Sequence, residues 1–77
     1  MDKEDVSIEI ASIRNALYHK NFLVAMTKLL DLRKMLKAWN LEHHVEPLIP
    51  ELAKAAKANA DTAVLEAKLK EIDVMVL

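Results

Sequence analysis

The one cluster of metal-ligand side chains in the sequence is the run from Glu42 to Glu46, which reads Glu-His-His-Val-Glu. Neighbouring side chains on a helix point about 100° apart, so His43 and His44 are not expected to share one ion. His43 and Glu46 could face the same ion, but two ligands do not make a zinc site. We interpret the run as an exposed helical turn and expect no metal and no cofactor.

Side chains suited to acid–base or nucleophilic catalysis do not form a recognisable motif with a histidine. The hydroxyl candidates are Ser7, Ser12, Tyr18, Thr27 and Thr62. The carboxylate pairs Asp2/Asp5 and Glu71/Asp73 lie near the ends of the chain among lysines, which is typical of charges on a helix surface. The sequence therefore predicts a protein that is not an enzyme.

Basic side chains gather on the helix expected at about residues 21–38. They are Lys28, Arg33, Lys34 and Lys37. The whole chain has a net charge of −1, so any positive field is local. This surface is either the solvated face of an ordinary helix or a landing surface for an acidic peptide segment. Nucleic acid is not an expected partner, because the chain has one Trp and no interleaved aromatic residues to stack on bases.

The composition excludes several other classes of protein. The 77 residues include no glycine and no cysteine. Phosphate-binding loops and nucleophile elbows depend on glycine, so a nucleotide-binding α/β enzyme is not expected. A chain without cysteine suits a reducing compartment. No apolar run approaches the roughly 20 residues of a membrane span, and the acidic start does not resemble a signal peptide, so no membrane association is expected.

The spacing of apolar residues predicts an all-α protein, with a single domain over residues 1–77 that is a compact bundle of four to five short helices. The expected helices cover about residues 5–18, 21–38, 41–46, from 47–50 to 58, and from 61–62 to 74. Asp5 and Asn21 are the expected N-caps of the first two helices. Asp61 or Thr62 is the expected N-cap of the last helix.

The second helix has the widest apolar face, from Phe22 to Trp39, and is expected to lie centrally against more than one neighbour. Leu29, Leu32 and Leu52 lie on the strongest apolar stripes and are the predicted core. Trp39 is expected to cover the core. The buried side of the last helix is expected to consist of Ala63, Leu65, Leu69, Ile72 and Met75.

Four stretches of the chain also match a known pattern of helices and loop lengths. They are residues 8–17, 25–32, 48–54 and 63–67, which are spread over most of the span from residue 6 to residue 73. In these stretches the chain resembles the N-terminal-domain family of transcription elongation factor S-II. It looks closest to the integrase-binding-domain branch of chromatin coactivators.

The resemblance implies a docking domain that holds short disordered motifs, in which acids flank apolar residues, within transcription elongation and chromatin complexes. In that branch two inter-helix loops make the docking surface, and they correspond here to residues 17–22 and 56–60. The branch has an acidic residue where this chain has Lys20 and a bulky aromatic where it has Ala58. The S-II branch commonly has a tryptophan in its last helix, which this chain lacks. The resemblance therefore implies the docking mode of that branch but not its particular partners.

The expected peptide-binding residues are Tyr18, His19, Lys20, Phe22, Lys28, Lys57 and Ala58. The partner's apolar side chain is expected to rest on Phe22 and Tyr18 while its acids meet Lys20 or Lys28. The resemblance implies a nuclear protein, and without it the expected location is cytoplasmic. The alternative function is that of a small helical adaptor or homodimer subunit, whose partner surface is Trp39 and the apolar tail at 74–77.

Overall fold

The computed structural model describes residues 2–76 of the chain. It consists of α1 (Lys3–Tyr18), α2 (Phe22–Lys37), α3 (Leu48–Ala58) and α4 (Ala63–Val76), with a single turn of 3-10 helix, η1 (Glu42–His44), between α2 and α3. Residues 2–76 contain no strand. The predicted all-α class is therefore confirmed, and the bundle has four α-helices and one short turn.

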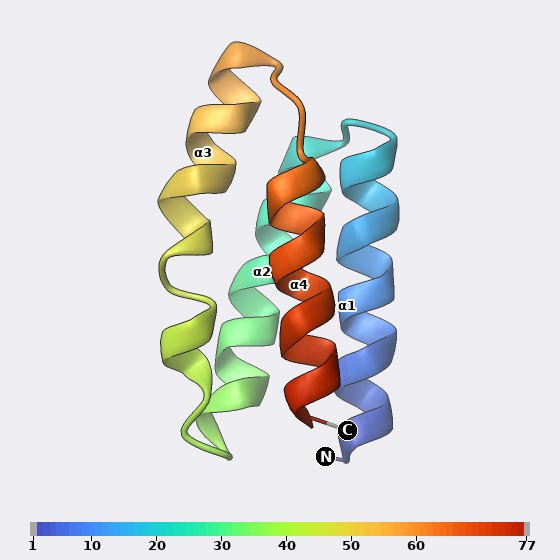
Figure 1. Cartoon of the computed structure of the whole chain (residues 1–77), viewed down its shortest axis with the longest axis vertical. Coiled ribbons are helices and arrows are strands. Elements are labelled where there is room, and N and C mark those ends of the chain that lie inside the picture. The colour runs from blue at the N-terminus through green and yellow to red at the C-terminus, as the bar shows by residue number, and fades with distance from the viewer. Residues whose placement is uncertain (1, 77) are drawn as a thin grey trace.

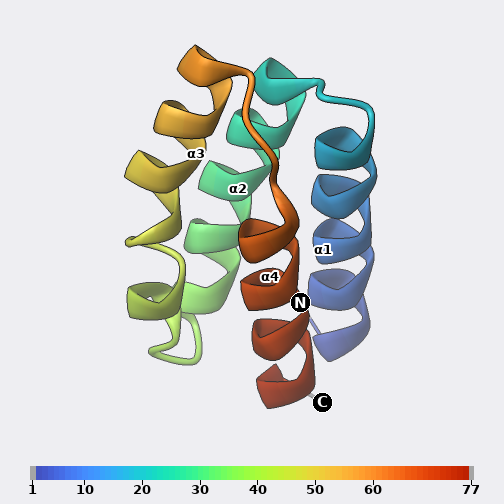
Figure 2. The same ribbon diagram turned by 45° about the horizontal axis from the view of Figure 1, so that its top comes forward.

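The helices run alternately up and down the bundle (Figure 1). α2 packs against α1, η1 and α3, which confirms that the second helix is central, and α4 packs against α1 and α3. α1 begins and α4 ends at one end of the bundle, while the α1–α2 and α3–α4 connections lie at the other end (Figures 1 and 2). We call the latter end the loop end.

The start of α1 differs from the prediction, because Asp2 and not Asp5 is its N-cap. The Asp2 side chain accepts a hydrogen bond from the Asp5 amide at 3.0 Å, and the Asp5 side chain accepts one from the Asp2 amide at 3.2 Å. This reciprocal capping box satisfies two amides that have no partner inside the helix. At the start of α4, where Asp61 or Thr62 is the expected cap, the Asp61 side chain accepts a hydrogen bond from the Ala63 amide at 3.0 Å and the Thr62 carbonyl accepts one from the Glu66 amide at 2.9 Å.

The first three helices end in one hydrogen-bonded motif, in which a residue with left-handed backbone follows the helix. These residues are Lys20 (φ 56°), Asn40 (φ 59°) and Asn59 (φ 50°). The next amide then reaches back five residues to a helical carbonyl, over 2.8 Å from Asn21 to Ala16, 3.1 Å from Leu41 to Leu36 and 2.9 Å from Ala60 to Ala55.

This arrangement is the Schellman motif, whose left-handed position is usually glycine and sometimes asparagine. Two of the three positions are Asn, whose short polar side chain tolerates this conformation. Lys20 has no such relief, and the left-handed backbone costs an ordinary residue roughly 1–2 kcal/mol. The chain therefore reverses direction three times without glycine, and the strain is greatest at Lys20.

The core runs the length of the bundle along the inner faces of all four helices. The predicted core residues Leu29, Leu32 and Leu52 are confirmed as buried. Trp39 is half-buried and packs against the core, as expected for a residue that covers it.

The prediction for α4 is wrong at its two ends, because Ala63 and Met75 are exposed. The buried face of α4 consists of Leu65, Leu69, Ile72 and Val76. Their spacing of four, three and four residues follows one side of a helix, and Ala63 and Met75 fall outside it.

Truncation of Leu32 should test the core directly. Leu32 is fully buried, whereas Leu23, on the same helix, is 80% exposed. We expect Leu32→Ala to lower the free energy of unfolding by about 2–5 kcal/mol, and the control Leu23→Ala to change it by less than about 0.5 kcal/mol. Chemical denaturation monitored by circular dichroism measures both. Equal effects would show that α2 is rotated from the orientation described.

Substitution of Asn40 should test the Schellman motif at the end of α2. Glycine adopts a positive φ freely, so Asn40→Gly is expected to keep or slightly raise the free energy of unfolding. Asn40→Ala should lower it by about 1 kcal/mol, because the Cβ of alanine clashes in this conformation without a polar side chain to offset the cost. Thermal and urea denaturation of the two variants measure the difference. An alanine variant as stable as the glycine variant would contradict the left-handed assignment.

Candidate functional site

The loop end brings together two connections that are distant in sequence. The Lys20 ammonium, in the α1–α2 loop, donates a hydrogen bond to the backbone carbonyl of Asn59, at the end of α3, at 3.4 Å. The two residues are 39 positions apart. Figure 2 shows the same juxtaposition, with both connections at one end of the bundle. The two loops expected to form a docking surface therefore lie side by side.

The loop end displays large apolar side chains to solvent. Tyr18, the last residue of α1, is 77% exposed, and Leu23, in the first turn of α2, is 80% exposed. The Tyr18 ring meets the His19 ring edge-on, with 5.1 Å between ring centroids. Leu23 was not among the predicted site residues. The sequence could have indicated it, because Leu23 is a large apolar residue that follows Phe22 but falls outside the apolar stripe continuing through Ala25.

The other expected residues at the loop end differ in exposure. Phe22 is half-buried and packs against the core, so it presents only part of its ring to a partner. Lys57 and Ala58, the last two residues of α3, are both exposed. The loop end therefore combines exposed apolar groups with the cations Lys20 and Lys57.

Lys28 does not belong to this surface. It lies further along α2, and its ammonium pairs with the Glu9 carboxylate of α1 at 3.7 Å. Both side chains are partly buried, with 35% of Lys28 and 18% of Glu9 exposed. A cation already paired with a carboxylate of its own chain is less available to a partner's acid than Lys20, whose ammonium donates to a neutral carbonyl, or Lys57.

The remaining cations of α2 lie near its other end. Arg33, Lys34 and Lys37 line a hollow of about 280 Å³ together with Glu42 and Glu46. One carboxylate oxygen of Glu42 is buried there without a hydrogen-bond partner among residues 2–76. The basic stripe of α2 therefore faces acids of its own chain and does not extend to the loop end.

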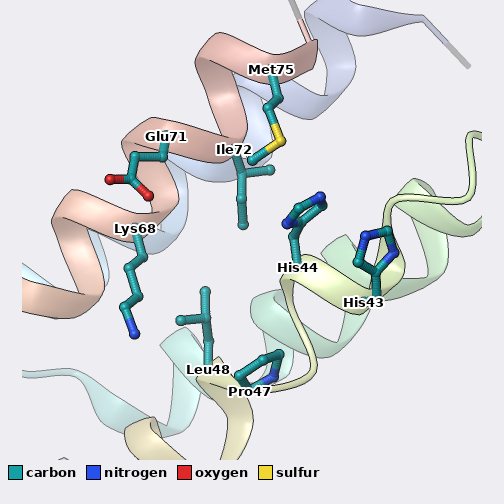
Figure 3. Close-up of a pocket in the computed structure, with 8 residues that line it drawn as sticks. All are labelled: His43, His44, Pro47, Leu48, Lys68, Glu71, Ile72 and Met75. Carbon is teal, nitrogen blue, oxygen red and sulfur yellow. The ribbon is translucent and has the colours of Figure 1, made fainter.

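His43 and His44 lie beside a second hollow, of about 200 Å³, between α4 and the η1–α3 segment (Figure 3). Their rings come within 4.1 Å between centroids, so they do not diverge as the sequence suggested. Ile72 and Met75 of α4 border the hollow opposite His44 (Figure 3). Within residues 2–76 no group of three or more His, Cys, Asp or Glu side chains is placed to hold a metal ion.

The outer face of α4 carries a third, largely apolar hollow, of about 420 Å³. It is lined by Ala67, Lys70, Glu71, Val74 and Met75. Val74 is 65% exposed and Met75 is 48% exposed, while Val76 in the same turn is buried. The expected apolar tail is therefore split between the core and the surface, and Leu77 lies outside the described residues.

Comparison with protein family models, curated proteins and solved structures finds no match to this chain. None of the helices in the described part of the chain combines the length and apolar character needed to cross a membrane.

Proposed function

We propose that the protein is a docking domain that binds short, partly disordered peptide motifs in which acidic residues flank apolar ones. The observation that carries the proposal is the pairing of the two loops at the loop end, across the contact from Lys20 to Asn59. These are the loops that the resemblance to the integrase-binding-domain branch assigns to peptide docking. The same resemblance motivates a role in transcription elongation or chromatin complexes in the nucleus.

The chemistry of the loop end supports a partner of this kind. Tyr18 and Leu23 are the two most exposed of the large apolar side chains among the described residues, and both lie at the loop end. A partner's apolar residue that covers them would supply most of the affinity. Lys20 and Lys57 would attract the acids and contribute mainly to the association rate and to orientation. A partner that must become ordered on binding is expected to bind with micromolar affinity.

Titration of the labelled domain with an acidic-apolar peptide tests the proposal. We expect the amide shifts to cluster at residues 17–24 and 56–62 and the affinity to fall as salt is raised. Tyr18→Ala should weaken binding. Ile8→Ala is the matched control, because Ile8 is 62% exposed on α1 outside the loop end. Loss of affinity in both variants alike, or shifts outside the loop end, would contradict the proposed site.

The exposed apolar face of α4 supports a second candidate function, that of a helical adaptor or homodimer subunit. Its surface would be the outer hollow at Val74 and Met75. Trp39 would contribute less than the sequence suggested, because it is half-buried against the core. Such a surface is mainly apolar, so association through it should depend little on salt.

Light scattering coupled to size-exclusion chromatography separates the two candidates. A docking domain should elute as a monomer, with a mass independent of concentration. A homodimer subunit should show a mass that rises with concentration and returns to that of a monomer in Val74→Glu. Ile8→Glu is the control for adding a carboxylate to an exposed apolar position. A mass that falls equally in both variants would indicate non-specific association and would exclude the α4 surface.

A further inference from the structure

Lys20 is the exception among the three residues that end helices with left-handed backbone. Asn40 and Asn59 suit this conformation, and lysine does not. The backbone hydrogen bonds are the same at all three positions, so they do not explain why position 20 carries lysine. What distinguishes Lys20 is its long side chain, whose ammonium reaches the carbonyl of Asn59.

The contact joins two of the three Schellman motifs to each other. Asn59 is itself the left-handed residue at the end of α3, and the Ala60 amide that follows it bonds back to Ala55 at 2.9 Å. A lysine ammonium near the last carbonyls of a helix is also favoured by the negative end of the helix dipole. An asparagine at position 20 would relieve the backbone strain, but its shorter side chain would not bridge the two loops.

We infer that Lys20 is a positioning residue, whose ammonium acts as a clasp that fixes the spacing of the α1–α2 and α3–α4 connections. Its consequence for peptide binding rests on the proposed docking function, but the clasp itself is a property of the free protein. A residue that keeps a strained backbone conformation is a candidate for a local function that the strain makes possible. Here the role is to hold together two loops that are not joined by an ion pair within residues 2–76.

Amide hydrogen exchange and chemical shifts of the free protein test the clasp. Lys20→Met keeps the length and the backbone strain but removes the ammonium, and Lys20→Arg keeps a donor. We expect Lys20→Met to shift the amide signals of residues 59–61 and to speed exchange at Ala60 severalfold, with Lys20→Arg close to the original protein. His19→Gln is the control, since it changes the neighbouring residue in the same loop. Residues 59–61 are far from position 20 in sequence, so a change in their signals would report the contact between the loops. Unchanged amide shifts and unchanged exchange at residues 59–61 in Lys20→Met would overturn the inference.

Peptide affinity then separates the clasp from a direct charge contact. One acidic-apolar peptide is compared with a variant whose acids are replaced by amides. If Lys20 positions the loops, Lys20→Met weakens binding of both peptides by a similar factor. If Lys20 only attracts acids, the loss is confined to the acidic peptide, which would contradict positioning. If neither peptide binds the original protein, the docking function fails while the exchange measurement still decides the clasp.

Discussion

The fold depends on three reversals of the chain that are made without glycine. At Lys20, Asn40 and Asn59 the backbone enters the left-handed region, and the following amide closes onto the preceding helix. Each closure ends one helix and sets the direction in which the chain leaves it. The alternation of helices, and with it the meeting of two connections at the loop end, depends on these three turns (Figure 1).

The small size of the domain explains where its interaction surfaces can lie. A chain of this length buries only about 60% of its unfolded surface, and its large apolar side chains are mostly used in one core. Two of the hollows described above lie between elements, as at His44 and Met75 (Figure 3), and the third lies on the outer face of α4. Exposed apolar side chains that a partner could cover lie at the loop end, as Tyr18 does, and on the outer face of α4.

The basic residues of α2 look like one positive patch in the sequence, but the folded structure places acids of the same chain near them. Lys28 is paired with Glu9, and the cations nearer the end of α2 face Glu42 and Glu46 across one hollow. Acids beside these cations reduce the positive field that a partner meets, although charge contacts near a protein surface typically contribute only about 0–1 kcal/mol to stability. The positive charge left at the loop end, on Lys20 and Lys57, is modest, so under the proposed docking function the exposed apolar groups there would contribute more to affinity.

The sequence by itself determined the helical class, the positions of the breaks and the core leucines such as Leu32, because these follow from local spacing of apolar and capping residues. It misplaced the cap at Asp5, because a capping box needs a reciprocal bond that only the folded first turn reveals. Only the tertiary structure decided that Lys28 meets Glu9 and that Lys20 meets Asn59. Both contacts join residues on different elements, and their partners are chosen by how the helices pack and not by any period within one helix.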